Sequence, residues 1–248
     1  MKLNFFGKNL LIAGGSNDIA VCTAKIAVKE NLFPTLTFRS QKSASRIEKE
    51  LSGMEGKYGV AFLDFAEPDS VDRLFRDYGV EPDYLVDLVH GDYESLTASA
   101  GQDKINSYLN QNIAVRTGLV RLASRIMVKK RKGRLLYISS AAAERPAMGQ
   151  GFYAASKLAS EAVYNNTGLE LASRGVTSLI IRPGYIYSGR GKKFADKDFD
   201  TIREKIPVKR LIDPQELAEA IIFFLSDSSL SFNAVKIRMD GGLLAGKQ

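Results

Sequence analysis

The stretch that decides the fold is Leu10-Leu11-Ile12-Ala13-Gly14-Gly15-Ser16-Asn17-Asp18, near the start of the chain. Its first four residues are apolar, which is typical of a short buried strand, and a helical pattern runs from Ile19 to Glu30. In a strand, glycine turn and helix of this kind, backbone N–H groups and the helix N-terminus face a pyrophosphate. The stretch therefore predicts a dinucleotide site at the end of a buried strand.

Further short apolar segments follow along the chain. They span Pro34–Phe38, Val60–Phe65, Tyr84–Val89, Leu135–Ile138, Leu179–Ile181 and Ile237–Met239. A long helix is predicted over Asp103–Lys132, and another helix is predicted to begin at Asp213 as N-cap with Pro214 in its first position. These patterns predict an α/β fold with one doubly wound, mostly parallel sheet of seven strands and helices on both faces.

Composition narrows the class of protein. The chain has 248 residues, 45% of them hydrophobic, without a run of about 18 apolar residues that could cross a membrane. The N-terminal residues lack the features of a signal peptide, so we expect a cytoplasmic protein of one domain, residues 1–248. The net charge of +7 suits an anionic cofactor or an acidic partner, and no nucleic-acid motif accompanies it. The single cysteine, Cys22, excludes an internal disulfide, and the single histidine, His90, has no ligand-spaced neighbours, so no metal site is predicted.

The strongest chemical signal is Tyr153-Ala154-Ala155-Ser156-Lys157. A tyrosine and a lysine four residues apart lie on one face of a helix. A free phenol has a pKa of about 10, and a neighbouring ammonium favours the phenolate and lowers that pKa. The pair is therefore a candidate proton donor that could work near neutral pH. Ser139 and Ser140 end the apolar segment upstream of it.

With these residues the chain resembles the short-chain dehydrogenase/reductase family, from about Lys8 to Gly242. In that family a serine precedes the active tyrosine by thirteen positions, which corresponds to Ser140, and an asparagine on the preceding helix corresponds to Asn112. The resemblance implies a Rossmann fold and a catalytic tetrad of Asn112, Ser140, Tyr153 and Lys157. It also implies a local distortion of the asparagine's helix, and a water on the Asn112 carbonyl that begins a proton relay.

The resemblance places the cofactor mainly on residues 8–110 and the catalytic and substrate part on 110–248. The family's Thr-Gly-x-x-x-Gly-x-Gly pattern is changed at Asp18 and Ala20, and we expect Asp18 to cap the helix. Arg39 and Ser40 end the second strand where NAD enzymes commonly carry an acid, which favours NADP(H). The cofactor-binding residues implied in this way are Gly14, Ser16, Asn17, Ile19, Arg39, Ser40, Asp64, Phe65, Gly91, Tyr153, Lys157, Pro183, Gly184, Ile186 and Ser188.

Two further expectations come from the same resemblance. Residues 189–207 correspond to the family's mobile lid over the substrate. Arg131 and Arg174 match arginines by which bacterial 3-oxoacyl-[acyl carrier protein] reductases meet their acidic carrier. The resemblance also implies a homotetramer, whereas Asn233-Ala234, in place of the usual Thr-Gly, leaves a dimer open.

Three functions are consistent with the sequence. The first is NADPH-dependent reduction of a carbonyl, either a 3-oxoacyl thioester on acyl carrier protein, as in fatty acid biosynthesis, or a polyketide-like ketone. The second is an oxidoreductase of the same fold acting on a free small-molecule ketone or alcohol. The third is a binding or regulatory protein, favoured by the altered glycine motif and by Leu88-Val89-His90-Gly91 in place of Asn-Asn-Ala-Gly.

Overall fold

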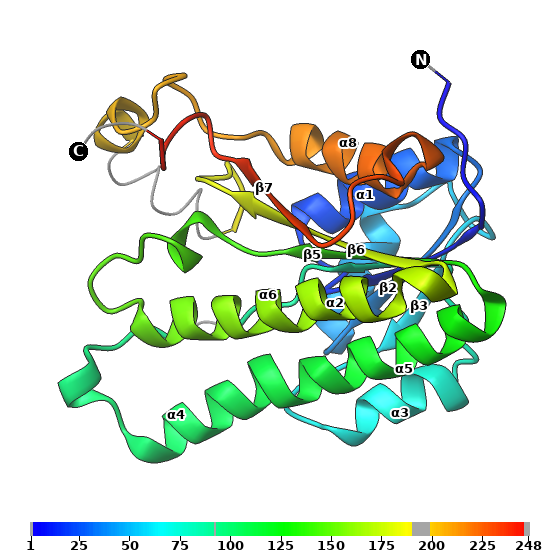
Figure 1. The fold of residues 1–248 in the computed structure, drawn as a ribbon, viewed down its shortest axis with the longest axis horizontal. Helices are drawn as coiled ribbons and strands as arrows, with labels where there is room; N and C mark the ends of the chain where they lie inside the picture. Colours follow the sequence, from blue (N-terminus) through cyan, green and yellow to red (C-terminus); the bar gives the residue numbers. More distant parts are fainter. Residues whose placement is uncertain (1, 92, 190–198, 246–248) are drawn as a thin grey trace.

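Seven parallel strands form one sheet in the order β3-β2-β1-β4-β5-β6-β7 (Figure 1). The computed structural model describes residues 2–91, 93–189 and 199–245. The strands are β1 Asn9–Ala13, β2 Phe33–Phe38, β3 Gly59–Phe62, β4 Tyr84–Asp87, β5 Gly133–Ile138, β6 Val176–Pro183 and β7 Val235–Met239. The predicted doubly wound sheet is confirmed, and all six strand pairings in it are parallel.

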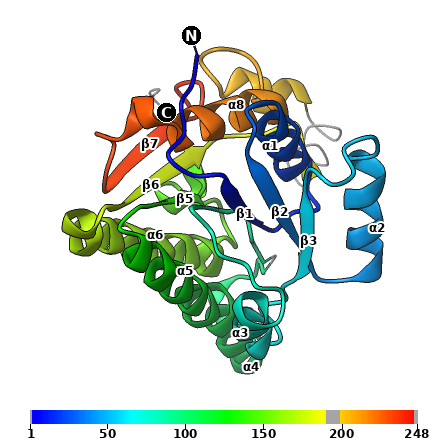
Figure 2. The same ribbon diagram turned by 90° about the vertical axis from the view of Figure 1, so that its right-hand side faces the viewer.

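Helices cover both faces of this sheet. They are α1 Asp18–Lys29, α2 Gln41–Glu50, α3 Asp69–Arg76, α4 Gln102–Leu109, α5 Arg116–Lys130, α6 Gly151–Leu171 and α8 Pro214–Leu225. Figure 2 shows α1, α2 and α8 on one side and α3 to α6 on the other. Asp213 accepts from the backbone N–H of Gln215 and Pro214 follows it, as predicted for the start of α8.

Side chains along each strand point alternately to the two faces of the sheet and so form two separate hydrophobic cores. On β1, Leu10 and Ile12 pack with residues of α1, α2 and α8, whereas Leu11 and Ala13 pack with residues of α3, α5 and α6. Successive strand side chains point to opposite faces, so a strand buried on both sides must be apolar at every position. This requirement explains the continuous apolar segments of the sequence.

Two elements differ in extent between the sequence prediction and the structure. The third strand ends at Phe62 rather than Phe65, because the Asp64 carboxylate accepts from the Ala66 N–H and the Ser70 hydroxyl bonds both the N–H and the carbonyl of Asp64. The helix predicted over Asp103–Lys132 is divided into α4, a π-helical turn at Asn110–Val115, and α5. The local distortion implied at Asn112 is therefore present, and a π turn of this kind often marks a functional site.

The order of the strands fixes where a ligand can bind. The chain runs outward from β1 through β2 to β3 and then returns to β4 on the other side of β1. At such a reversal the connections leave the strands in opposite directions, which opens a crevice at the carboxyl ends of β1 and β4. Gly14 follows β1 and Leu88 follows β4 at this edge.

We predict that Gly15→Ala lowers the free energy of unfolding by about 1–3 kcal/mol, the usual cost of overpacking. A methyl group at Gly15 would lie 2.6 Å from the Leu36 Cβ and 2.8 Å from the Thr37 backbone nitrogen, neither of which can move freely. Chemical denaturation of the purified chain measures the change. Gly118→Ala is the matched control: its methyl group has no neighbour within 4 Å, and α5 should become more stable by about 0.5–1 kcal/mol. Equal stabilities of the two variants would contradict the packing described.

Candidate active site

Helix α6 presents Tyr153 and Lys157 at the carboxyl edge of the sheet. Both side chains are buried, and the Lys157 ammonium lies 5.7 Å from the centre of the Tyr153 ring. Lys157 also donates a hydrogen bond of 3.0 Å to the carbonyl of Ile138, the last residue of β5. This bond ties the first turns of α6 to the end of β5, so the cation stands beside the phenol in a fixed position.

The two hydroxyls that follow β5, those of Ser139 and Ser140, have different partners. Ser139 is buried and donates to the Glu161 carboxylate at 2.6 Å, so it is a structural group. Ser140 is half-buried and caps a short 3-10 turn at Ala141–Ala143, accepting from the Ala142 N–H at 3.1 Å. Because that bond uses an oxygen lone pair, the Ser140 hydroxyl hydrogen remains able to donate toward the cleft.

Glu161 organises a buried charge network that the sequence did not indicate. Arg182, on β6, donates to both Glu161 oxygens at 2.8 and 2.5 Å and also to Glu144 at 2.7 Å. The hydrogen bond that Arg182 donates to Glu161 is the main cause that raises the pKa of Arg182. The network joins α6 to the ends of β5 and β6, and so supports the segment that carries Ser140. A carboxylate, an arginine and a serine far apart in sequence leave no spacing signal by which to find it.

Asn112 lies in the π turn and is almost fully buried. Its side chain accepts from the Gly91 N–H at 3.1 Å and donates to the Tyr108 carbonyl at 2.9 Å. Its own carbonyl accepts from Arg116 at 2.7 Å and from the Ser160 hydroxyl at 3.1 Å. Asn112 therefore links the loop after β4, where Gly91 lies, to α4 and α6. All its side-chain and carbonyl oxygens have protein partners.

The glycine turn after β1 is held by β2. Gly14 donates to the Thr37 hydroxyl and Gly15 to the Thr37 carbonyl, both at 2.9 Å. Gly14 has a φ of +82°, a conformation that favours glycine. Asn17 is the N-cap of α1, since its side-chain oxygen accepts from the Ala20 N–H at 2.9 Å. The prediction that Asp18 caps this helix is therefore wrong.

Asp18 is instead the first residue of α1 and reaches across the cleft. One carboxylate oxygen accepts from the Ser188 hydroxyl at 2.6 Å, and the other pairs with Arg46 of α2. Ser188 lies in the segment that follows β6, beyond Pro183 and Gly184. The N-cap is the residue immediately before the first helical turn, which here is Asn17. Asparagine is as favourable as aspartate in that position.

Backbone bonds fix the segment Pro183–Ser188, in addition to the side-chain bond from Ser188 to Asp18. Gly184 donates to Met239 at the end of β7, and Tyr187 donates to Ile212 at 2.9 Å. Ile186 forms an isolated parallel bridge with Ile212. Of the lid expected over 189–207, residues 190–198 lie outside the described residues; residues 199–204 are helical, and Ile202 and Ile206 pack with Leu211.

The other residues expected to bind the cofactor follow β1, β2 and β3 along the same edge of the sheet. Arg39 and Ser40 are exposed at the end of β2, where Ser40 caps α2. Ser16 and Ile19 lie in and directly after the glycine turn, and both are half-buried. Asp64 is half-buried and its carboxylate accepts from Ala66. Phe65 is buried, with its ring 5.5 Å from the Arg116 guanidinium, so its side chain belongs to the core.

Arg131 and Arg174 lie together at the opposite edge of the sheet. Arg131 follows α5 and Arg174 follows α6, and the loops that contain them meet through a bond of 3.1 Å from Gly133 to Gly175. Tyr153 is in the first turn of α6, a helix of 21 residues and therefore about 30 Å long. The two arginines are thus separated from the tyrosine of the same chain by the length of a helix.

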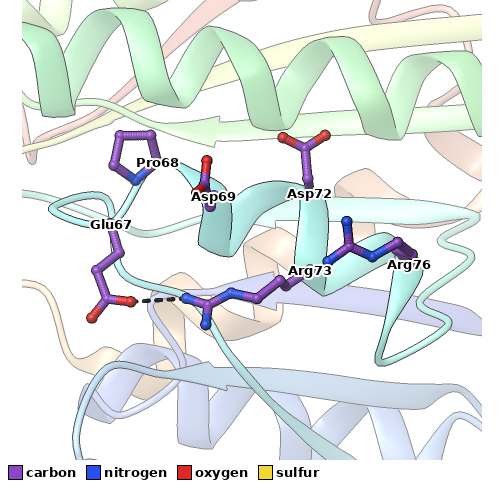
Figure 3. A pocket seen from close by; sticks show the side chains of 6 residues that line it. All are labelled: Glu67, Pro68, Asp69, Asp72, Arg73 and Arg76. Atoms are coloured by element: carbon purple, nitrogen blue, oxygen red, sulfur yellow. Dashed lines mark hydrogen bonds and ion pairs between the residues drawn. The ribbon is translucent and has the colours of Figure 1, made fainter.

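A surface hollow at the start of α3 is distinct from this site (Figure 3). It is lined by Glu67, Pro68, Asp69, Asp72, Arg73 and Arg76. Glu67 and Arg73 form an ion pair of 2.8 Å across it. None of the candidate catalytic or cofactor residues lines the hollow, so we assign it no role.

In the part of the chain that the structure describes, no group of three or more His, Cys, Asp and Glu side chains is arranged to hold a metal ion. Nor does any helix within residues 2–91, 93–189 and 199–245 have the length and apolar character needed to cross a membrane.

This geometry defines a Rossmann-type α/β protein with a Tyr-Lys pair beside a glycine turn. The family model described as enoyl-(acyl carrier protein) reductase matches residues 13–244, and the chain belongs to this family of short-chain dehydrogenases/reductases.

Curated relatives agree with this assignment to the family, and a solved structure shares the fold. The chain is 28% identical over 244 residues to the 3-oxoacyl-[acyl-carrier-protein] reductase FabG of Salmonella typhimurium, with 97% of this chain and 99% of the relative covered. It is 26% identical over 242 residues to FabG of Thermotoga maritima, covering 96% and 98%. A solved structure described as "ElxO with NADP Bound" superposes with a TM-score of 0.86 at 23% identity, covering 96% of this chain and 99% of that one. These structural matches support the fold.

Proposed function

We propose that the chain catalyses the NADPH-dependent reduction of a carbonyl to an alcohol, with a 3-oxoacyl thioester as the substrate class. The observation that carries the proposal is the position of Tyr153, with Lys157 and the Ile138 carbonyl fixed beside it. These groups lie at the edge of the sheet where the connections after β1 and β4 leave in opposite directions. Asn112 and Ser140 lie at the ends of neighbouring elements on the same edge. A binding protein would not need a phenol with an adjacent ammonium at this place.

The residues at the glycine turn fit a dinucleotide. The backbone N–H groups at the start of α1 and the dipole of this helix suit a pyrophosphate, and the absence of side chains at Gly14 and Gly15 lets the turn pack closely against the end of β4 and against β2. Arg39 and Ser40 are exposed at the end of β2, where a cation and a hydroxyl suit a 2′-phosphate rather than a free ribose hydroxyl. The negative charge of Asp18 is offset by Arg46. Gly91, Asp64, the backbone at Phe65 and the segment Pro183–Ser188 would hold the remaining parts of the cofactor.

When bound, NADPH supplies the hydride, which adds to the carbonyl carbon of the substrate. Tyr153 gives its hydroxyl proton to the carbonyl oxygen as negative charge grows there. Ser140 donates a hydrogen bond to the same oxygen, and a donor placed where charge develops is worth more in the transition state than in the ground state. Lys157 favours the phenolate that remains on Tyr153. The protein thus supplies position, a proton and electrostatic stabilisation.

A substrate linked to acyl carrier protein is supported by the names of the curated relatives and by the basic ends of α5 and α6. Because Arg131 and Arg174 lie a helix length of about 30 Å from Tyr153 of the same chain, we propose that a carrier docked there serves the site of another copy. Antiparallel pairing of α5 and α6 in a homodimer or homotetramer would bring the two together.

Reduction of a free ketone is the alternative function, and it is favoured if substitution of Arg131 and Arg174 leaves the activity unchanged. It needs the same four catalytic residues but no carrier, so the test of the carrier arginines below separates the two. A binding or regulatory role is the third candidate, favoured by the Asp18–Ser188 bond across the entrance to the glycine turn.

Tyr153→Phe should lower kcat by about 10²–10⁴-fold, because the proton donor is lost, while the Kd for NADPH stays within a few-fold. Steady-state assays of NADPH absorbance with a 3-oxoacyl thioester, and fluorescence titration of NADPH, measure the two quantities. Tyr78→Phe removes a hydroxyl from an exposed tyrosine outside the site and should leave both unchanged. Turnover of Tyr153→Phe at the wild-type rate would reject the assignment, and absence of saturable NADPH binding by the wild type would favour the regulatory role.

Asp18→Gly should lower the Kd for NADPH about fivefold, since removing a like charge near a phosphate is worth ~1 kcal/mol at a partly exposed helix N-terminus. The effect should shrink as salt screens the charges. Asp18→Asn is the matched variant: it removes the charge but can still accept from Ser188, so it separates repulsion from the bond across the cleft. Weaker NADPH binding by both variants would mean that Asp18 does not oppose the cofactor.

Charge reversal at Arg131 and Arg174 tests whether an acidic carrier docks there. Combined with Tyr153→Phe, it also tests whether the docked carrier serves the site of the same chain or of another copy. Arg131→Glu/Arg174→Glu should reduce kcat/KM for a carrier-linked substrate at least tenfold and leave that for a free thioester unchanged. Lys29→Glu/Lys57→Glu, which reverses two exposed cations elsewhere, is the control.

If docking acts between subunits, co-assembly of this variant with Tyr153→Phe should restore activity on the carrier-linked substrate, because one subunit offers arginines and the other a tyrosine. Equal loss with both substrates would argue against carrier docking. Absence of recovery in confirmed mixed oligomers would place docking and catalysis on the same chain.

A further inference from the structure

Side chains on both sides of Ser140 are held by charged groups. Ser139, directly before it, donates its hydroxyl to the fully buried carboxylate of Glu161 at 2.6 Å. Beyond the short turn that Ser140 caps, Glu144 accepts from Arg182 at 2.7 Å. The segment that contains Ser140 is therefore attached at its two ends.

A single ion pair joins these two points of attachment. Arg182 donates to both carboxylate oxygens of Glu161, at 2.8 and 2.5 Å, and the side chains of Arg182 and Glu161 are 11% and 0% exposed. Arg238 of β7 donates to the Glu144 carboxylate at 3.2 Å. Charge-assisted hydrogen bonds that share a buried carboxylate leave few other positions for the groups that make them. Ser139, Glu144, Glu161 and Arg182 together are named the serine clamp.

The serine clamp determines the direction in which Ser140 points. The backbone is extended there, since Ser140 has a φ of −161° and a ψ of 151°. Successive side chains of an extended chain point to opposite sides, so the bond that holds the Ser139 hydroxyl on Glu161 also fixes the opposite direction of Ser140. The bond from the Ala142 N–H to the Ser140 hydroxyl lies within the same segment. It moves with that segment and cannot fix the segment's position.

We propose that Glu161 and Arg182 are positioning residues of the active site, which hold both ends of the segment and so direct the Ser140 hydroxyl at the substrate carbonyl. The inference rests on the proposed function for its catalytic meaning. In that reaction Ser140 donates to an oxygen on which negative charge grows, so its direction matters most in the transition state. Loss of the clamp therefore lowers kcat and leaves KM unchanged.

Ser139→Ala releases one end of the segment and leaves the Glu161–Arg182 pair intact. We expect kcat to fall about 10-fold, because a shift of about 1 Å in a reacting group has effects of this order or larger. KM and the Kd for NADPH should stay within about twofold. Ser178→Ala is the matched control: Ser178 is a buried serine of β6 whose hydroxyl has no hydrogen-bond partner among the described residues. A kcat of Ser139→Ala within about threefold of the wild type overturns the proposal.

Glu144→Ala releases the other end and keeps the test open if Ser139→Ala does not fold. The Glu144 side chain is 34% exposed, so its removal should leave the fold intact. We expect kcat to fall about fivefold with KM unchanged. Glu216→Ala is the control, because Glu216 is 39% exposed and also pairs with an arginine, Arg210, at 2.6 Å. An unchanged kcat in Glu144→Ala, or an equal fall in Glu216→Ala, overturns the proposal.

A double substitution tests whether the clamp acts through Ser140. Ser140→Ala already removes the hydroxyl that the clamp directs, so adding Ser139→Ala to it should lower kcat by less than about twofold further. Residues that act through one another give effects that do not multiply, whereas independent effects do. A further 10-fold fall in the double variant would mean that Ser139 acts by another route, and it would overturn the proposal.

Crystal structures separate this inference from the proposed function. Compared with the wild type, Ser139→Ala should show the Ser140 hydroxyl displaced by more than about 0.5 Å, the tolerance of a productive catalytic geometry, or in a second rotamer. An unmoved Ser140 overturns the inference, whatever reaction the chain catalyses. If Ser140 moves but the wild type reduces no carbonyl compound, the proposed function fails and the positioning of Ser140 by the clamp stands.

Discussion

The direction of the strands is the constraint on which everything else in this protein depends. Because all seven strands are parallel, their carboxyl ends meet along one edge of the sheet, and the loops that follow β1, β4, β5 and β6 must come together there. Gly14, Gly91, Ser140 and Pro183 are brought to this edge by that rule alone. The helices then run away from the edge, which leaves the basic ends of α5 and α6 on the far side.

Two buried ion pairs lie near this edge of the sheet. Asp87 with Arg116 joins β4 to α5, and Glu161 with Arg182 joins α6 to β6. Buried pairs of this kind contribute little net stability, since desolvation offsets much of their attraction. Their value here is geometric, because each one fixes a loop that carries a candidate catalytic group.

Much of this could be predicted from the sequence, and the failures are physically instructive. Apolar segments predicted the inner strands, because a parallel sheet covered on both faces must be apolar throughout. The edge strand β7 alternates instead, with Lys236 and Arg238 exposed. The spacing of Tyr153 and Lys157 indicated the pair because helical geometry is local. Arg116 and Glu161 could not be found in that way, since charged residues on helices are usually solvated and only the folded chain reveals their partners. Asn17 and Asp18 are adjacent and chemically similar, so only the geometry of the turn determined which of them caps α1.

The π turn at Asn110–Val115 has a consequence for how this chain could change over time. One additional residue in a helix rotates everything beyond it by about 100°. Tyr108 faces α6 while Arg116 faces the end of β4 only because that rotation lies between them. A single-residue deletion in this stretch would restore an uninterrupted helix and turn one of these side chains toward solvent. The length of the segment is therefore under constraint as well as the identity of Asn112, and substitutions at its exposed positions, Asn110 and Ala114, should be far better tolerated than changes in length.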